Sequence, residues 1–226
     1  MAAARLSPMK LTKYGHACVR LEKDGRVLVI DPGTFSDVAA ALEGADAVLV
    51  THEHADHLDT TRVLPALAAD PDLVLYAPAP LAATLRDGAG DAATRILDAV
   101  PEAAFDLAGF SVRTYGGQHA LIHAHIPVVH NIGYVIDEAL YHPGDSFTVP
   151  HDVQVTTLLV PAHAPWSKSG EVIDFVIAVR PKKVYPIHDG LLNERGLALV
   201  DGHVGRFGGL YGASYERLES GVGREV

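Results

Sequence analysis

The stretch Thr51-His52-Glu53-His54-Ala55-Asp56-His57 decides how this chain of 226 residues is interpreted. It directly follows the apolar run 47–50, which predicts a buried strand. Residues two apart in an extended chain point the same way, so the imidazoles of His52 and His54 can reach one cation. The chain must then turn toward a predicted helix near residue 59, which brings Asp56 and His57 to a second point. Imidazole and carboxylate ligands suit zinc, manganese or iron.

Ligands crowded in one loop do not complete a metal site, so other groups must come from elsewhere in the chain. Candidates follow four further apolar segments, and small residues beside them allow close approach of the backbone. They are Asp31 after 26–30, His119 after 110–115, Asp145 after 139–141 and His188 after 183–187. If these segments run side by side as strands, one sheet edge collects all the candidates. The alternative is a helix-capping aspartate among surface histidines.

Strands and helices alternate along the chain, which predicts a layered α/β architecture in a single domain, residues 1–226. The predicted strands are 9–14, 17–22, 26–30, 47–50, 73–77, 110–115, 132–136, 139–141, 156–160 and 183–187. The predicted helices are 36–42, 59–69, 81–86 and 171–179. Pro65 lies inside the second helix, so its first turn is expected to begin later than residue 59. The glycine-rich tail beyond residue 202 has no assignment.

The composition excludes several classes of protein. Apolar residues make up 48% of the chain, charged residues 20%, and the net charge is -10. This charge argues against a nucleic-acid or anionic-membrane partner, since both need a basic face. No apolar run approaches the ~20 residues of a membrane span, and the first residues lack the apolar stretch of a secretion signal. The single cysteine, Cys18, excludes an internal disulfide, and we expect a cytoplasmic protein.

Taken together, these residues resemble the metallo-β-lactamase-fold hydrolases. That superfamily has a first-strand aspartate, an H-x-H-x-D-H loop, a later histidine, a later aspartate and a final histidine. Asp31, the loop at 52–57, His119, Asp145 and His188 match this order and these strand-end settings. The resemblance implies a four-layer αβ/βα sandwich with metals at one edge. The opening 15–18 and the segment 141–146 resemble the compact cytoplasmic branch that includes ascorbate-6-phosphate lactonase.

The resemblance also implies a ligand set. The first metal ion would be bound by His52, His54 and His119, and the second by Asp56, His57 and His188. Asp145 would bridge both ions. Asp31 would orient a histidine of the loop, because metal-bound imidazoles usually donate their other ring N–H to a carboxylate or carbonyl.

The implied activity is that of a dinuclear metal-dependent hydrolase. Two divalent ions, zinc by preference with manganese or iron as alternatives, would make a bridging hydroxide available near neutral pH. It would cleave an ester, lactone or phosphodiester in a small molecule, with Asp56 as the catalytic residue that aligns it. A nuclease on the same fold is one alternative, and a non-catalytic metal-binding protein is another.

Four further side chains are candidates for lining the pocket. They are His16, His123, His163 and Trp166, and each is weighed against an ordinary structural or surface role. His163 follows a predicted strand and could donate a proton to a leaving group. The sequence leaves the substrate, the physiological metal and the oligomeric state open.

Overall fold

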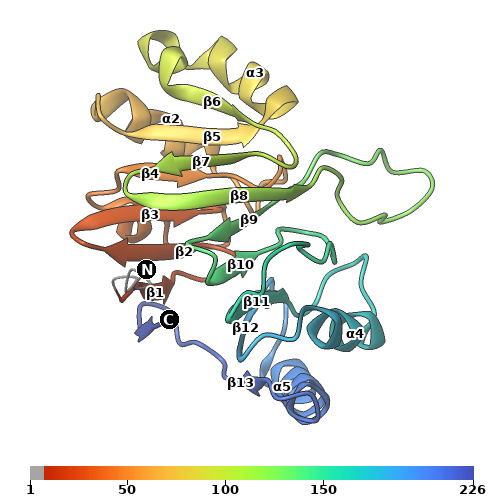
Figure 1. Ribbon diagram of the computed structural model, residues 1–226. Helices are drawn as coiled ribbons and strands as arrows, with labels where there is room; N and C mark the ends of the chain where they lie inside the picture. The colour runs from red at the N-terminus through yellow and green to blue at the C-terminus, as the bar shows by residue number, and fades with distance from the viewer. Residues whose placement is uncertain (1–7) are drawn as a thin grey trace.

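The computed structural model describes residues 8–226 and has four layers. Two seven-stranded sheets lie face to face, and helices cover the outer faces (Figure 1). Three helices belong to the first sheet: α1 (Val38–Leu42), α2 (Thr60–Ala69) and α3 (Ala79–Gly88). Two belong to the second: α4 (Ser169–Val179) and α5 (Glu194–Gly209). The predicted αβ/βα sandwich is confirmed.

The first sheet has the strand order β14-β1-β2-β3-β4-β5-β6. Its strands are β1 (Lys10–Lys13), β2 (Val19–Lys23), β3 (Arg26–Ile30), β4 (Ala47–Leu49), β5 (Val74–Pro78), β6 (Ile96–Ala99) and β14 (Gly223–Glu225). The strands from β3 to β6 run parallel, and the pairs β1–β2 and β2–β3 are antiparallel. Asp24 and Gly25 turn the β2–β3 hairpin with φ angles of 51° and 75°, and a type I′ turn requires positive φ at both central residues.

The second sheet has the order β13-β12-β11-β10-β9-β8-β7. Its strands are β7 (Ala104–Leu107), β8 (Phe110–Gly116), β9 (Ile132–Ile136), β10 (Leu140–His142), β11 (Thr157–Pro161), β12 (Lys183–Ile187) and β13 (Ser214–Tyr215). The strands from β10 to β13 run parallel, whereas β7 to β10 are antiparallel. A β-strand buried on both faces reads as a continuous apolar run, which is why β9 and β11 were recognisable in the sequence.

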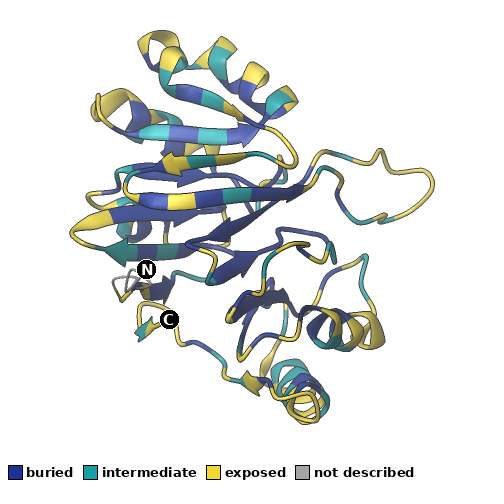
Figure 2. Ribbon diagram, viewed as in Figure 1, coloured by how far each residue is buried: buried dark blue, intermediate teal, exposed yellow. Residues whose placement is uncertain are grey.

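Three apolar clusters hold the layers together. Figure 2 shows that most of the strands are buried. The central one joins the facing surfaces of the two sheets, for example Leu28 and Leu49 with Phe110 and Tyr134. The other two lie between each sheet and its own helices. Burial of apolar surface on both faces of each sheet therefore fixes where the strand ends lie, and with them the loops that follow.

Helix α2 starts at Thr60, within the predicted range 59–69, and Pro65 inside it does not delay its first turn. Asp59 caps it by accepting hydrogen bonds from the Thr61 backbone N–H and hydroxyl, and the buried Val63 and Leu67 anchor it to the first sheet. Side-chain capping and packing therefore outweigh the cost of an interior proline.

The C-terminal part of the chain forms α5, the strands β13 and β14, and the turns between them, and α5 starts at Glu194, before the unassigned tail beyond residue 202. Asn193 caps α5 by accepting from the backbone N–H groups of Arg195 and Gly196. The helix persists despite five glycines after its first residue because Val204 packs into the cluster under the second sheet. No helix among residues 8–226 is both long and apolar enough to cross a membrane.

Candidate metal centre

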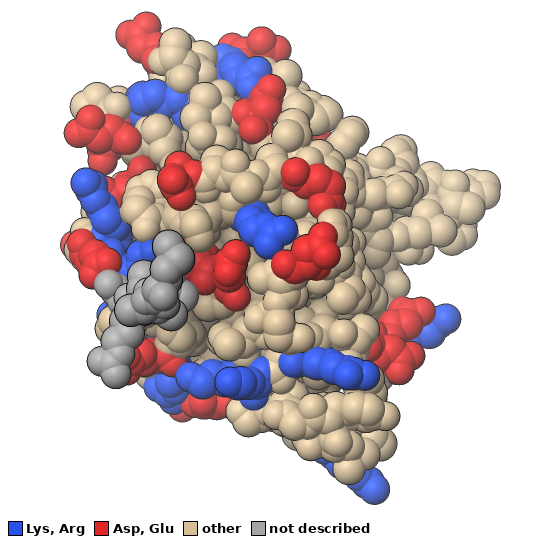
Figure 3. Space-filling model, in the orientation of Figure 1, with Lys and Arg blue, Asp and Glu red and all other residues tan. Residues whose placement is uncertain are grey.

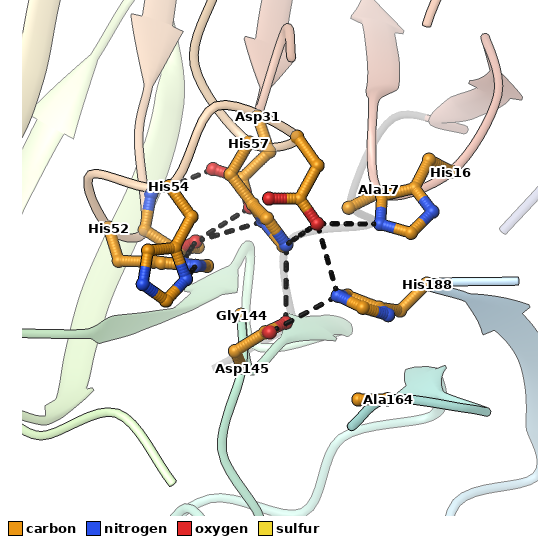
Figure 4. Close-up of polar contacts among 12 residues, drawn as sticks. His16, Ala17, Asp31, His52, His54, His57, Gly144, Asp145, Ala164 and His188 are labelled. Carbon is orange, nitrogen blue, oxygen red and sulfur yellow. Dashed lines mark hydrogen bonds and ion pairs between the residues drawn. The ribbon is translucent and has the colours of Figure 1, made fainter. Parts of the chain in front are cut away.

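The predicted site residues converge at one end of the two sheets, as Figure 4 shows for Asp31, His52, His54, His57, Asp145 and His188. Asp31, His52, His119, Asp145 and His188 each lie one to three residues after the end of a strand. The remaining three come from the turn that joins β4 to α2, within the loop 52–57. The structure therefore brings residues from five loops of both sheets into one place.

These side chains form two groups that could each hold a metal ion. The first group contains His52, His54, His119 and Asp145, and the second contains His16, Asp56, His57 and His188. Within each group the available ligand atoms all lie within 4.8 Å of one another. All members except His54 and Asp56 are buried.

Asp145 lies between the two groups. Its Oδ2 is 3.3 Å from His119 Nε2 of the first group and 3.2 Å from His188 Nε2 of the second. Its Oδ1 is 3.2 Å from His57 Nε2. Trp166 fixes the carboxylate further, because its indole N–H donates to Oδ2 over 2.9 Å. One carboxylate thus faces the ligand atoms of both groups.

Three histidines are oriented by hydrogen bonds from Nδ1. His57 donates to Asp31 Oδ2, His119 to the Ala120 carbonyl and His188 to the His163 carbonyl, each over 2.6 Å. An imidazole whose Nδ1 carries the proton presents an unprotonated Nε2 when it is neutral. The Nε2 atoms of all three are the ones that approach Asp145. These backbone and carboxylate contacts therefore select the ring nitrogen that faces the centre.

Asp31 acts through a wider network than the sequence predicts. Besides His57, it accepts the Thr51 backbone N–H over 2.7 Å and the Thr51 hydroxyl over 2.6 Å. The Thr51 hydroxyl oxygen also lies 3.0 Å from His52 Nδ1. Asp31 therefore holds both the start of the loop and the imidazole at its end. Thr51 was not a predicted site residue, although it directly precedes the motif.

Two glycines permit the close packing around the loop. A Cβ on Gly33 would collide with the backbone of Asp56 and His57, and a Cβ on Gly144 would collide with Thr51 and Asn131. Asn131 in turn accepts the Asp145 backbone N–H over 2.9 Å. The prediction that small residues beside the candidates allow close approach is confirmed at these two positions.

His16, predicted only as a pocket candidate, is buried against Asp56. The Gly190 backbone N–H donates to His16 Nδ1 over 3.2 Å, so in the neutral ring Nε2 carries the proton. That nitrogen lies 3.1 Å from Asp56 Oδ2 and can donate to it. Burial lowers the pKa of His16, which favours this neutral form. His16 therefore serves as a hydrogen-bond donor to Asp56.

Several buried polar atoms in the centre make no hydrogen bond to the protein. Among the described residues, His57 Nε2, His119 Nε2 and Asp145 Oδ1 are buried without any hydrogen bond. Buried polar atoms nearly always have a partner, so unpaired ones call for a water molecule or an ion. Lone pairs from imidazole and carboxylate that face one another fit divalent cations, so the two groups are able to bind metal ions.

The two groups differ in their electrostatics. Burial and neighbouring imidazoles lower the pKa values of His52 and His54. Burial also opposes protonation of His57, but the carboxylates of Asp145 and Asp31 outweigh it and raise its pKa well above the usual range. In the same contact, the positive charge of His57 helps to hold the pKa of Asp145 well below its usual range, against the effect of burial.

The pKa of His188 is raised by neighbouring carboxylates, as that of His57 is. Burial lowers its pKa, but hydrogen bonds with Asp145 and Asp56 dominate and raise it to about 9. The pKa of Asp56 is in turn well below its usual range, because His16 and His188 overcome the effect of burial. Both carboxylates of the centre are therefore ionised at neutral pH, and in the metal-free protein the second group holds protons in place of a cation.

A cavity of about 340 Å³ opens over both groups. Trp166 lines it, as predicted, whereas His123 and His163 are not among its lining residues. The His123 side chain is exposed in the loop between β8 and β9, and the His163 side chain lines a separate cavity beside α5. His163 serves the centre through its backbone carbonyl only. Phe35 and Leu191 also line the cavity and were not singled out in the sequence.

The chain belongs to the beta-lactamase superfamily, since the family model described as "Beta-lactamase superfamily domain" matches residues 10–188. Protein Rv0786c of Mycobacterium tuberculosis is 41% identical over 189 residues, which cover 81% of this chain and 85% of that protein. A UPF0173 metal-dependent hydrolase of Geobacillus thermodenitrificans is 42% identical over 57 residues, 24% of this chain and 25% of that protein.

The fold is shared with solved structures at low sequence identity. The metallo hydrolase Igni18 from Ignicoccus hospitalis superposes with a TM-score of 0.75 at 18% identity, covering 97% of this chain and 99% of that one. The family and the fold predicted from the sequence are thus confirmed.

Proposed function

We propose that this protein is a dinuclear metal-dependent hydrolase that cleaves an ester, lactone or phosphodiester bond in a small molecule. One observation carries the proposal: Asp145 faces two groups of ligand atoms, and its own Oδ1 and the Nε2 atoms of His57 and His119 are buried without a hydrogen bond. The enzyme class agrees with the superfamily of the chain and with relatives that are named metal-dependent hydrolases.

The two groups would hold the two ions. His52, His54 and His119 would bind the first, Asp56, His57 and His188 the second, and Asp145 would contact both. Two bound dications would lower the pKa of a water molecule and polarise the bond to be cleaved. We propose zinc, with manganese and iron as alternatives, because this ligand set contains nitrogen and oxygen but no sulfur.

Asp56 is the proposed catalytic residue. His16 donates to its Oδ2, which leaves Oδ1 available to accept a hydrogen bond from the attacking water and align it. Its pKa is low, so it stays an acceptor across the neutral range. His16 and the backbone of Gly190 hold the carboxylate in this orientation.

A small-molecule substrate is supported by the size and charge of the surroundings. The cavity of about 340 Å³ is at the lower end of the range for small-molecule sites, and none of its described lining residues is Lys or Arg. The net charge of the chain, -10, disfavours a nucleic-acid or anionic-membrane partner. We propose a cytoplasmic location, in keeping with the single cysteine, whose side chain is buried.

The experiment is elemental analysis of protein purified without added metal, combined with a panel of esters, lactones and phosphodiesters. We expect about two metal equivalents per chain and turnover on the panel, both lost in His54→Ala and Asp145→Ala. Two bound ions without turnover on any substrate would favour a non-catalytic metal-binding protein. Tight RNA binding that persists at raised salt would favour a nuclease.

A further inference from the structure

The walls of the cavity above the metal ligands are apolar. Beyond the ligands themselves and Thr34, the lining residues are Phe35, Ala55, Ile122, Pro165, Trp166 and Leu191. Phe35 and Leu191 are about half exposed, at 50% and 55%, although both are large apolar side chains. Large apolar groups left open to water beside a reactive centre mark a surface that a ligand covers.

A second, larger cavity shows that this apolar character is local. It measures about 930 Å³, lies on the far side of His16, and shares Phe35 with the first cavity. Charged residues line it: Lys13, Asp189, Glu194, Asp201, Arg217 and Glu219. Most of these charges are already paired, for instance Lys13 with Asp189 and Arg217 with Glu194 and Asp201. The charged lining ends where the metal ligands begin.

The loop between β8 and β9 adds Ile122 to the apolar wall, and the same loop carries the exposed histidines His123, His125 and His130. Residues 114–136 contain no Asp, Glu, Lys or Arg, and Ile122 of this segment lines the metal cavity. The base of the loop is paired by the hydrogen bond from His119 N–H to the Val129 carbonyl. Its outer part projects from the body of the protein (Figure 1), and this projection shows no charged side chain in Figure 3. Leu121 at 61% and Ile126 at 44% are exposed on it.

We propose that the part of the substrate next to the cleaved bond is an uncharged, apolar group, an acyl chain or an aromatic ring, which packs against Phe35, Ile122 and Leu191. This inference rests on the proposed hydrolase function and narrows its substrate class. A charged group in this position would be desolvated against apolar walls without a counter-ion from the protein. An apolar group would instead remove exposed side chains from water.

The binding test uses the sole tryptophan of the chain, Trp166, which lines the cavity. Its fluorescence reports binding without any need for turnover. The metal-loaded protein is titrated with acetamide, butanamide and hexanamide. Each buried methylene contributes roughly 0.8 kcal/mol, about fourfold in affinity, so each step of two methylenes should tighten binding about fifteenfold. Leu191→Ser should reduce the gain in affinity at each step several-fold. Leu210→Ser, at an exposed position outside the cavity, is the matched control.

The kinetic test compares p-nitrophenyl acetate, butyrate and hexanoate, together with ethyl and hexyl p-nitrophenyl phosphate. In whichever bond class is cleaved, kcat/KM should rise with chain length. The succinate monoester has the same number of acyl carbons as the butyrate but carries a carboxylate, and it should be the poorer substrate by at least tenfold. In Leu191→Lys the preference for the butyrate over the succinate monoester should shrink or reverse, because the new ammonium group supplies a counter-ion for the carboxylate.

The outcomes separate the two proposals. Amide affinity that rises with chain length, in a protein that binds two metal ions yet cleaves nothing, would support the apolar site and overturn the hydrolase function. Turnover that is indifferent to chain length, with the succinate monoester as good as the butyrate, would overturn the apolar site and leave the hydrolase function standing. The absence of a saturable Trp166 response to hexanamide would also overturn the apolar site.

Discussion

The two groups of ligands contain similar side chains but present them in different states. In the first group, burial and neighbouring imidazoles favour neutral His52 and His54. In the second, carboxylates around His57 and His188 favour the protonated rings. The first group is therefore ready to bind a cation at neutral pH, whereas the second must first release protons. Surroundings, rather than ligand type, distinguish the two.

The largest expected effect comes from removing the residue that the two groups share. Asp145→Ala should abolish binding of both ions and lower kcat/KM roughly a thousandfold or more, since the charge that faces both groups is gone. Elemental analysis and turnover measure this. Asp137→Ala is the matched control, because Asp137 is also buried and accepts the Ser111 backbone N–H, but at the opposite end of β9. Retention of one full metal equivalent in Asp145→Ala would contradict a shared ligand.

Asp31→Ala should weaken the second group more than the first. His57 loses the acceptor that orients it, which typically costs about 10–100-fold in metal affinity. The buried Thr51 N–H also loses its acceptor, so the free energy of unfolding should fall by about 1–3 kcal/mol. Metal titration and chemical denaturation measure the two effects.

Asp46→Ala is the control for Asp31→Ala. Asp46 accepts the Val27 backbone N–H over 2.7 Å, as Asp31 accepts that of Thr51, but Asp46 lies just before β4, whereas Asp31 lies just after β3. This variant should lose stability and keep its affinity for metal. Equal weakening of the two metal equivalents by Asp31→Ala would count against the distinction between the groups.

The pH dependence of metal binding should differ between the two groups of ligands. His188 has a raised pKa of about 9 in the metal-free protein, so below pH 9 an incoming cation must displace its proton. Affinity for the second ion should therefore rise as pH increases from 7 to 9. Affinity for the first ion should change little, because the pKa values of His52 and His54 are lowered. Calorimetry in buffers of different ionisation enthalpy counts the released protons, and identical profiles for both ions would refute this account.

The smallest effect is expected at His16, which touches Asp56 without being needed as a ligand. His16→Ala should lower kcat about tenfold with little change in KM or metal content, because Asp56 loses its orienting donor. His16→Gln, whose amide can donate, should recover part of the loss, and His151→Ala at an exposed position serves as control. Loss of one metal equivalent in His16→Ala would instead identify His16 as a ligand.

Much of the centre was predictable because its residues carry local signals. The loop 52–57 follows a continuous apolar strand, and Asp31, His119, Asp145 and His188 each follow another, so strand ends alone bring them together. The family and four-layer fold are confirmed by the match to residues 10–188 and by the structure. The single-domain assignment, the ligand roles and the substrate stay predictions.

Other features depend on tertiary contacts that leave no pattern in the sequence. His163 contributes its backbone carbonyl, and the link between His16 and Gly190 joins residues far apart in the chain. Helix α5 was missed because its glycines hide the usual apolar spacing, and the Asn193 cap and packing under the second sheet stabilise it. Leu191 lies in a short loop where nothing marks it as a cavity wall.

The central claim is that two cations share Asp145. Electron paramagnetic resonance of the manganese-loaded protein tests it most directly, since two Mn²⁺ ions joined by common ligands are magnetically coupled. We predict a coupled spectrum at two equivalents per chain that is lost in Asp145→Ala, which should bind neither ion. The six-line signal of isolated ions in the wild-type protein at full loading would contradict the account.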